Sequence, residues 1–357
     1  MNSIIIFIPS LGYGGAERVT VRIANYLSHK YNVNVVTVKK EAKEYELDDR
    51  VHRINLDSKS ALSSIFEMRK MVKKIKPYFT ITMFAPMYIV TYFAQFGLGI
   101  PQIVSERNDP ERFAGKDIVK KLYQFLLKRA DGIVFQTSDA ARYYYREKNN
   151  KSTIIFNPII KEELPDVNFD ERLGRVISIG RLHPQKNHKM LIDAFIKLHH
   201  VFEKYKLDIY GAGELSDYLT DYISENNATG YISLKGTTND VLGELNKSEL
   251  FVLSSDFEGM PNTLIEAMCM GVPSISTDCP CGGPREIIEN GENGILVPVG
   301  DSDALFEAMK KVLSDKRLEE KISHNAERIR DLLDINKVGN QWIDFCEYIS
   351  KEKRKDA

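Results

Sequence analysis

The feature that most constrains how this chain folds is a regular alternation of short apolar runs with longer amphipathic runs. The short runs are rich in Val, Ile and Phe and have the length of buried strands, whereas the longer runs have helical periodicity. Strands that alternate with helices form parallel sheets with helices on both faces. We therefore predict an α/β protein of doubly wound parallel sheets, with strands at 3–8, 33–38, 51–55, 79–83, 102–105, 132–136, 153–156, 175–180, 206–210, 231–234, 250–253, 273–276 and 294–297, and last helices at about 302–314, 317–333 and 335–350.

The length of the chain indicates more than one core. Its 357 residues suit two domains, and a polar segment with two prolines, residues 156–175, predicts the connection between them. We expect an N-terminal domain at 1–157, a C-terminal domain at 158–335 and a last helix at 336–357 that packs back on the N-terminal domain. In doubly wound domains ligands bind beyond the carboxyl ends of the strands, where loops of both domains would face one cleft.

The net charge of −1 hides two halves of opposite sign. Residues 1–157 hold 25 Lys and Arg against 15 Asp and Glu, a formal charge of +10, and residues 158–357 hold 24 against 35, a charge of −11. A basic half suits an anionic partner. The C-terminal KEKRKDA is basic as well, and we expect a solvated, frayed tail there.

Two features bear on the cellular setting. The cysteines lack the spacing of a disulfide framework or a zinc site, and the N-terminal apolar run lacks the charged start and cleavage site of a signal peptide. Both favour a reducing, cytoplasmic location. Residues 77–105 carry no charge and are long enough to cross a bilayer, but prolines, glycines and a glutamine interrupt them. A buried strand–helix–strand unit is the prediction for that stretch.

A glycine-rich turn follows the first strand in PSLGYGGAER. Gly12, Gly14 and Gly15 would let backbone amides approach a ligand, and the following helix offers its N-terminus to an anion. Ordinary turn glycines are the alternative. A dinucleotide site, and with it a nicotinamide-dependent dehydrogenase, is disfavoured because the G-x-G-x-x-G spacing is absent and the second strand ends in lysines.

A second candidate site lies in GRLHPQKNH, after the strand at 175–180. Arg181 and Lys186 on one strand-to-helix loop suit a diphosphate, Arg as a planar fork and Lys as a point charge. The alternative is a pair of solvated charges, which their position at a strand end disfavours. We expect His183 and His188 to be surface or loop residues.

The stretch SSDFEGMPNTLIEAM begins as a loop and ends as a helix. It places Glu258 in the loop and Glu266 one turn into the helix, with Gly259 and Pro261 shaping the turn. Two carboxylates at such a strand end can accept hydrogen bonds from sugar hydroxyls.

These motifs together carry a resemblance. GGAER, GRLHPQKN, EGMPNTLIEAM and GGPREIIENGENGILV are similar, in order and spacing and over nearly the whole chain, to the retaining GT-B glycosyltransferases of family four. The resemblance implies that Arg181 and Lys186 clamp the donor diphosphate. It also implies that Glu266, the second glutamate of the E-x7-E motif, binds the ribose, and that Glu258 contacts the transferred sugar. Glu258, Arg181 and Lys186 are thus the candidate catalytic residues.

The resemblance also implies contacts through the backbone. The amides of Gly259, Met260, Asn262 and Thr263 would hold sugar hydroxyls and phosphate oxygens. The turn at Gly14 and Gly15 would approach the donor phosphate and the acceptor from the other domain.

IVSERNDPERF departs from the family pattern, which often has a histidine near this point. Glu106, Arg107 and Asn108 stand there instead and are our acceptor-side candidates, with Arg107 suited to a leaving or acceptor phosphate. A loop salt bridge from Arg107 to Glu106 or Asp109 is the alternative.

The reaction implied by the resemblance is transfer of a hexose or N-acetylhexosamine from a nucleotide sugar, above all a UDP-sugar, to a saccharide acceptor linked to polyprenyl diphosphate. Such enzymes assemble bacterial surface polysaccharide, such as lipopolysaccharide or capsule, or lipid-linked glycans. We expect no cofactor and no metal, because DSD at 301–303 suits a helix N-cap better than a metal site. A nucleotide-sugar epimerase and a non-catalytic carbohydrate-binding protein are the alternatives, and we expect no nucleic-acid partner.

Two basic helices bear on the acceptor side. Each carries an apolar stripe that we expect to pack on the sheet: Ile65, Met68, Val72 and Ile75 in the first, and Ile118, Leu122, Phe125 and Leu126 in the second. The surrounding lysines are solvated in the simplest interpretation. Their concentration in the acceptor domain also predicts peripheral attachment to anionic phospholipid at the inner face of the cell membrane.

Overall fold

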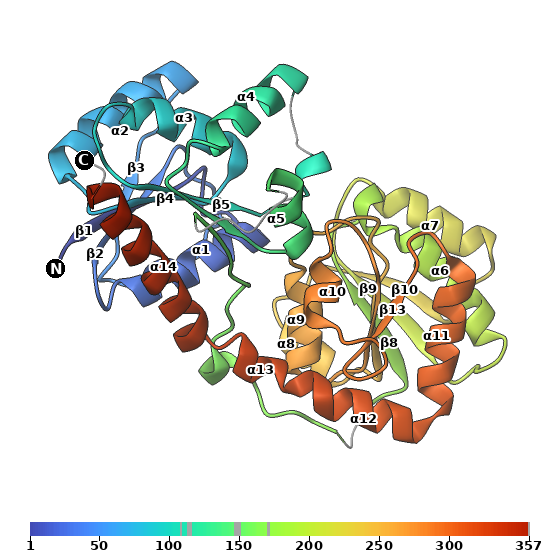
Figure 1. Ribbon diagram of the computed structural model, residues 1–357. Helices are drawn as coiled ribbons and strands as arrows, with labels where there is room; N and C mark the ends of the chain where they lie inside the picture. Colours follow the sequence, from blue (N-terminus) through green and yellow to red (C-terminus); the bar gives the residue numbers. More distant parts are fainter. Residues whose placement is uncertain (108, 113–115, 146–150, 170–171, 356–357) are drawn as a thin grey trace. The chain divides into compact units, whose positions relative to one another are not determined.

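The computed structural model describes residues 1–107, 109–112, 116–145, 151–169 and 172–355 (Figure 1). The chain divides into two compact units. Unit 1 consists of residues 1–159 and 333–357, and unit 2 of residues 160–332. The sequence placed these boundaries at 157/158 and 335/336, within three residues of those in the structure.

Unit 1 is built on a parallel sheet of seven strands in the order β3-β2-β1-β4-β5-β6-β7. The strands are near-continuous apolar runs because both faces of the sheet are covered by helices. Their bounds are β1 Ser3–Ile8, β2 Asn32–Thr37, β3 His52–Asn55, β4 Thr80–Thr82, β5 Gln102–Glu106, β6 Gly132–Phe135 and β7 Ser152–Ile154.

The helices of unit 1 fall into two groups according to their contacts. One group pairs α1 with the C-terminal helix α14, and in the other α3 packs between α2 and α4 (Figure 1). The chain adds strands on one side of β1 and later on the other, and right-handed crossovers made in these two directions along the sheet place their helices on opposite faces. The bounds are α1 Gly15–Leu27, α2 Ala61–Ile75, α3 Ala85–Gln95, α4 Asp117–Leu127, α5 Ser138–Tyr144 and α14 Ile335–Lys355.

Three expectations for this part of the chain have different outcomes. The uncharged stretch 77–105 forms β4, α3 and β5, so the strand–helix–strand prediction is confirmed. The stripe of α2 is confirmed too: Met68 and Val72 are buried in a core with β1 and β2. The predicted burial of the α4 stripe is wrong. Three of its four residues are exposed, and the helix packs through Tyr123, Leu126 and Leu127. None of the described helices is both long and apolar enough to cross a membrane.

The C-terminal helix α14 packs on unit 1. Gly339 lies against the ring of Tyr26 on α1, so closely that a Cβ there would be 2.1 Å from Tyr26 Cδ1. The expectation of a solvated, frayed basic tail is confirmed for its solvation, since four of the five described residues after Ser350 are exposed, but wrong for its fraying, because α14 continues to Lys355. Lys353 pairs with Asp131 at 2.9 Å and the guanidinium of Arg354 lies over a tyrosine ring, and these contacts hold the last turns.

Unit 2 has a second parallel sheet, with six strands in the order β10-β9-β8-β11-β12-β13. All 13 predicted strands are therefore present across the two units, each within two residues of its expected ends. The bounds here are β8 Arg175–Ile179, β9 Lys206–Tyr210, β10 Ile232–Gly236, β11 Leu250–Leu253, β12 Ser274–Thr277 and β13 Ile295–Val297. Two doubly wound, parallel α/β domains confirm the predicted fold class.

One core of unit 2 joins side chains of its strands to side chains of its helices and consists mainly of Ile, Leu and Val. The helix expected at 317–333 is divided, since α12 ends at Glu327 and a separate turn, α13, follows. The bounds are α6 His188–His199, α7 Ser216–Glu225, α8 Val241–Asn246, α9 Asn262–Cys269, α10 Gly283–Ile287, α11 Ser302–Ser314, α12 Lys316–Glu327 and α13 Ile329–Leu332.

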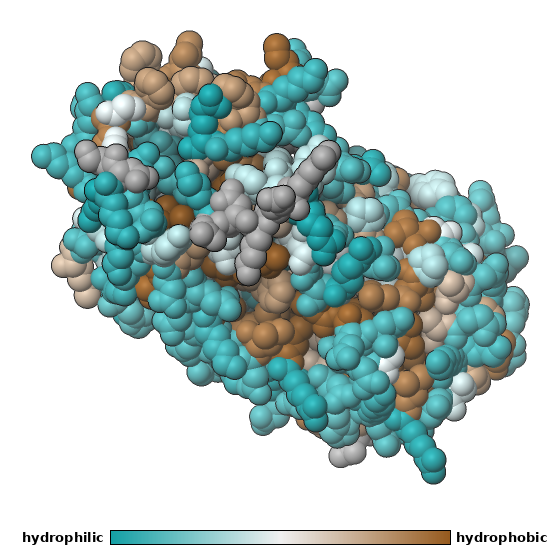
Figure 2. Space-filling model, in the orientation of Figure 1, coloured by the Kyte–Doolittle hydropathy of each residue, from teal (hydrophilic) through white to brown (hydrophobic). Residues whose placement is uncertain are grey.

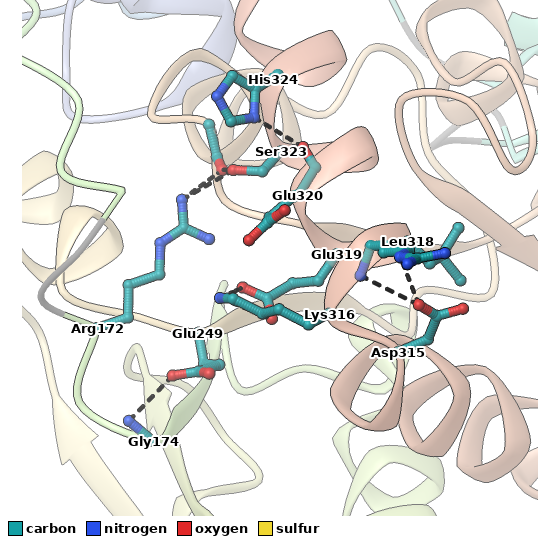
Figure 3. Close-up of polar contacts among 12 residues, drawn as sticks. Arg172, Gly174, Glu249, Asp315, Lys316, Leu318, Glu319, Glu320, Ser323 and His324 are labelled. Atoms are coloured by element: carbon teal, nitrogen blue, oxygen red, sulfur yellow. Dashed lines mark hydrogen bonds and ion pairs between the residues drawn. The ribbon is translucent and has the colours of Figure 1, made fainter.

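The polar segment 156–175 changes units near its start, and most of it then packs on unit 2. Arg172 anchors it: its Nη2 donates to the carbonyl of Gly271 at 2.6 Å and to Ser323 Oγ of α12 at 3.1 Å (Figure 3). Burial lowers the pKa of Arg172, against the opposing charges of Glu319 and Glu249. This polar cluster attaches the segment to unit 2 at α12.

Candidate active site

The strand order of unit 2 identifies where a ligand can bind. From β8 the chain adds β9 and β10 in one direction, then returns to β11 and adds β12 and β13 in the other. Open α/β sheets bind ligands at this reversal, outside the carboxyl ends of the strands. Because β8 and β11 are parallel neighbours, the loops that follow them begin side by side. These are the loops that carry the candidate residues of GRLHPQKNH and SSDFEGMPN.

Hydrogen bonds join the two loops. The amide of Asp256 donates to the carbonyl of Gln185 at 2.8 Å, and Asn187 Nδ2 donates to the Asp256 carboxylate at 2.7 Å. Ser254 Oγ donates to the carbonyl of Lys186 at 2.8 Å. The loops that the sequence treated as two separate motifs therefore form one surface.

At the centre of this surface Lys186 and Glu258 form an ion pair. Lys186 Nζ lies 2.5 Å from Glu258 Oε1, and Ser255 Oγ donates to the same oxygen at 2.6 Å. The two charged side chains are 15% and 9% exposed. Arg181, by contrast, is exposed, and its guanidinium has no acceptor among the described residues. The structure thus brings together two of the three candidate catalytic residues and leaves the third open to solvent.

Close backbone approaches shape this surface, at Gly211 and at Gly283 of the GGPRE motif, and neither glycine was predicted to have this role. A Cβ on Gly211, which has φ +148°, would lie 1.8 Å from the carbonyl oxygen of Gly180, just before Arg181. A Cβ on Gly283 would lie 1.6 Å from the carbonyl oxygen of Gly259, just after Glu258. Glycines that follow a strand, as in YGAGE and CGGPRE, are the signal that could have identified them.

The predicted donor-binding amides lie at the start of α9. Gly259 and Met260 belong to the loop, and Asn262 and Thr263 are the first helical residues. The first N–H groups of a helix have no acceptor inside it, and the N-cap residue Pro261 offers no side-chain cap. An anion or a hydroxyl oxygen can therefore be received there.

Glu266 lies one turn into α9, as expected, and is buried. Glu266 follows Thr263 by three residues and Asn262 by four, so all three lie on the same side of α9. The second glutamate of E-x7-E is thus in line with the start of the helix rather than with the Lys186–Glu258 pair. Its role toward a ribose remains a prediction.

His188 corrects an expectation. It was predicted to be a surface or loop residue, but it is the first residue of α6 and is buried. Its Nε2 lies 3.3 Å from the carbonyl oxygen of Arg181, and its Nδ1 has no partner in the described structure. Burial lowers the pKa of His188 to about 4, with the backbone contact to Arg181 opposing this and the charge of Lys186 adding to it. His183, in contrast, is half-buried in the loop, where its ring accepts from the amide of Gln185 at 3.2 Å.

This burial predicts acid sensitivity of unit 2. The folded pKa of about 4 lies below the ordinary value of 6.5, so the unfolded chain takes up a proton first as the pH falls. The contribution of His188 is fully present above pH 6.5 and is lost between pH 6.5 and 4, by about 3 kcal/mol in the free energy of unfolding. Urea denaturation at pH 7 and pH 4.5 measures it. In a His188→Leu variant this part of the pH dependence should disappear; an unchanged pH profile would contradict the assignment.

Unit 1 has its own reversal of strand order, between β1 and β4. The glycine-rich turn follows β1, and α1 begins at Gly15 with Gly14 as N-cap and no side-chain cap. Gly14 is extended, with φ −148°, and a Cβ there would meet only the flexible carboxylate of Glu17. The backbone conformation at Gly14 therefore does not itself demand glycine.

Glu17 and Arg107 were not linked by the sequence, although both lie in motifs that it identified. Burial raises the pKa of Glu17, against the opposing effects of its own backbone N–H and of the Arg107 charge. Arg107 is buried as well, which lowers its pKa to about 10 against the influence of Glu17. The structure therefore places a buried cation near the first turn of α1.

The acceptor-side candidates lie at the end of β5. The Arg107 guanidinium donates to Ser105 Oγ at 3.1 Å and to Asn157 Oδ1, rather than forming the predicted alternative of a loop salt bridge with Glu106 or Asp109. Glu106 is buried, and its carboxylate accepts from two tyrosine hydroxyls. Asn108 lies outside the described residues.

The DSD triplet behaves as a helix cap. Asp301 accepts from the amide of Ala304 at 2.8 Å as the N-cap of α11, which confirms that prediction, and Asp303 pairs with Lys197. Within the described ranges, no group of three or more His, Cys, Asp or Glu side chains is arranged to hold a metal ion. The four cysteines are buried and form no disulfide.

Comparison with known proteins connects this geometry to a function. Residues 13–163 match the model of the Glycosyltransferase Family 4, and residues 160–329 match that of the Glycosyl transferases group 1. A 4-alpha-N-acetylgalactosaminyltransferase from Campylobacter jejuni, named for its N-acetylgalactosamine-N,N'-diacetylbacillosaminyl-diphospho-undecaprenol substrate, is 28% identical over 97% of this chain and 99% of its own. A second enzyme from that organism, an alpha-1,4-N-acetyl-D-galactosaminyltransferase that is also named for a diNAcBac-PP-undecaprenol substrate, is 26% identical over 96% and 98%.

Solved structures agree on the fold. HepE from Anabaena, crystallised with UDP and glucose, superimposes with a TM-score of 0.82 over 98% of this chain and all of its own, at 19% identity. TarM from S. aureus does so with a TM-score of 0.79 over 97% of this chain and all of its own, at 13% identity. The two family models together cover residues 13–329, and the chain is a glycosyltransferase of the GT-B fold whose first domain matches the Glycosyltransferase Family 4 model and whose second matches the Glycosyl transferases group 1 model.

Proposed function

We propose that this glycosyltransferase transfers a hexose or N-acetylhexosamine from a UDP-sugar, with retention of anomeric configuration, to a saccharide on a polyprenyl diphosphate. The product would serve bacterial surface-polysaccharide or lipid-linked glycan assembly at the cytoplasmic face of the membrane. The observation that carries this is the similarity, over at least 96% of the chain, to two enzymes named for diphospho-undecaprenol-linked substrates. The UDP bound to HepE supports the choice of nucleotide.

The residue roles follow from the surface formed by the loops after β8 and β11. Arg181 is an exposed cation, and Lys186 has a carboxylate as its partner. A donor diphosphate would be held by both cations, and its charge would weaken the hold of Lys186 on Glu258. Glu258 could then accept hydrogen bonds from the transferred sugar, while Glu266 would bind the ribose and the start of α9 the phosphate and sugar oxygens.

The proposed reaction takes place on one face of the sugar. The bond from the anomeric carbon to the leaving phosphate oxygen breaks, and the acceptor oxygen forms its new bond on that same face. The acceptor proton passes to the leaving phosphate, whose growing charge Arg181 and Lys186 stabilise. A covalent route would require a carboxylate beneath the anomeric carbon, and the family resemblance assigns neither Glu258 nor Glu266 to that place.

We propose that the reaction needs no metal ion, because Arg181 and Lys186 supply positive charge for the diphosphate. Turnover is expected to be the same with EDTA as with added Mg²⁺ or Mn²⁺. Complete loss in EDTA with recovery on adding metal would contradict this.

The experiment that tests the function is a panel of UDP- and GDP-sugars with and without a short-chain, water-soluble polyprenyl-diphosphate saccharide. Nucleotide release that requires the acceptor, with an α-linked product seen by NMR from an α-linked donor, is the expected result. Epimerised donor without nucleotide release would indicate an epimerase. Donor or saccharide binding without any turnover would indicate a carbohydrate-binding protein.

A further inference from the structure

The exposed face of α2, α3 and α4 has a composition that a water-facing surface rarely has. Seven of the 17 large apolar side chains that are exposed in the described part of the chain lie on these three neighbouring helices. They are Leu62 and Phe66 on α2, Phe93 and Phe96 on α3 and at its end, and Ile118, Leu122 and Phe125 on α4. Apolar residues gather along this edge of unit 1 in Figure 2. We name these seven residues the apolar face.

Helix α4 shows most clearly that this face is separate from the core. Its inner side packs through Tyr123, Leu126 and Leu127, whereas Ile118 is 74% and Phe125 54% exposed. At 100° per residue the exposed side is turned about 120° from the buried side. The helix therefore has two apolar sides, and the protein covers only one of them.

Helix α2 repeats the arrangement. Leu62 is 69% and Phe66 72% exposed, although the helix buries Met68 and Val72 on another side. The Arg69 guanidinium donates to carbonyls at the end of α3 at 2.8 and 3.0 Å, which holds α2 against α3. The apolar face is thus a property of packed helices rather than of a loose segment.

The charges that surround the apolar face are almost all positive. Residues 61–76 hold five Lys and Arg against one Glu, and residues 116–129 hold five against one Asp. Residues 77–105, between them, hold no charge. The exposed lysines without an ion-pair partner in the described structure include Lys70 and Lys73 on α2 and Lys121 and Lys128 on α4. On a helix these positions are three, four or seven residues from Phe66, Ile118 and Phe125 and so lie beside them.

We propose that the apolar face of α2, α3 and α4 docks on an anionic phospholipid bilayer, with its aromatic and aliphatic side chains inserted at the acyl-chain boundary and its lysines at the headgroups. Apolar side chains with cations beside them are the composition of helices that lie in a membrane interface. Lysine stems can cover apolar surface while their charged ends reach phosphate. This inference deepens the proposed function, since it provides a surface on which an acceptor with a lipid tail is presented to unit 1.

The test is flotation of the full chain with phosphatidylcholine vesicles and with vesicles of phosphatidylcholine and phosphatidylglycerol at 7:3. Binding is expected on the anionic vesicles at 50 mM NaCl and should fall at 500 mM NaCl because salt screens the lysines. The variant Ile118→Ser/Phe125→Ser should bind at least about tenfold more weakly. The variant Lys121→Gln/Lys128→Gln should lose about fivefold in affinity for the anionic vesicles for each lysine removed.

Matched controls come from unit 2, where Leu173 is 67% and Val201 49% exposed. The variant Leu173→Ser/Val201→Ser should bind as the wild type does. A tryptophan reporter measures insertion, because the chain has one tryptophan, Trp342, which is buried. The emission of Phe125→Trp should be quenched by brominated acyl chains, and that of Leu173→Trp should not.

Several outcomes would overturn the proposal. These are no flotation with anionic vesicles at low salt, equal flotation of the apolar-face variant and the wild type, or equal quenching of the two tryptophans. A dimer in analytical ultracentrifugation that the apolar-face variant abolishes would assign the face to a second copy instead. Turnover of the water-soluble acceptor should be unchanged in every variant. Flotation that depends on the apolar face supports membrane docking even if no donor sugar is turned over. A failure of the docking inference can therefore be distinguished from a failure of the proposed function.

Discussion

Replacing Lys186 by alanine is expected to lower kcat about 100- to 1,000-fold, the range seen when one preorganised donor to a developing negative charge is removed. Lys186 Nζ is held 2.5 Å from Glu258, so its ammonium group is positioned before any donor arrives. Because charge on the leaving phosphate grows toward the transition state, KM should change less than kcat. Steady-state kinetics with a saturating water-soluble acceptor measure both constants.

The ion pair makes a second comparison necessary. Removing Lys186 also leaves the buried Glu258 carboxylate with only Ser255 as a described side-chain partner, which by itself is destabilising. Glu258→Gln and the double variant complete a double-mutant cycle that separates the two effects. Lys189→Ala, at an exposed lysine in the first turn of α6, is the matched control and should leave kcat unchanged. Full kcat in Lys186→Ala would exclude a role for Lys186 in the chemical step.

Replacing Gly283 by alanine is expected to impair both stability and turnover. The added Cβ would lie 1.6 Å from the carbonyl oxygen of Gly259, a backbone atom that cannot rotate away. Overpacking of this kind costs about 1–3 kcal/mol in the free energy of unfolding. The loop that carries Glu258 must also move, and a displacement of about 1 Å at a catalytic group can reduce the rate about 100-fold. Urea denaturation and kcat/KM report the two effects.

Gly230→Ala is the control for this substitution. Gly230 also belongs to unit 2 and is exposed, and a Cβ added there would meet no atom within 4 Å, so stability and turnover should be preserved. If Gly283→Ala retained wild-type kcat/KM, the position of the loop after β11 would not matter for turnover. If only stability fell, the contact between Gly283 and Gly259 would be purely structural.

The regular elements could be predicted because their signals are local. An apolar run of four to six residues specifies a buried strand wherever it lies, and the prolines and glycines within 77–105 were enough to distinguish β4, α3 and β5 from a membrane span. The DSD triplet was assigned as an N-cap for the same reason, since a cap depends on the next three residues, and Asp301 is the residue that caps. The failure at α4 has a cause outside the local sequence. An apolar stripe indicates that a helix has a side to bury, but Ile118 and Phe125 show that it does not say what covers that side.

The sequence by itself determined the doubly wound sheets, the two-domain organisation and the chemical types at the strand ends, because each depends on residues near one another in the chain. Only the tertiary structure decided that Lys186 meets Glu258, that His188 is buried behind Arg181, and which apolar residues of α4 face solvent. Lys186 and Glu258 are far apart in the chain and meet because β8 and β11 become neighbours when strand order reverses. That pairing follows from the packing of the whole sheet, which no single segment specifies.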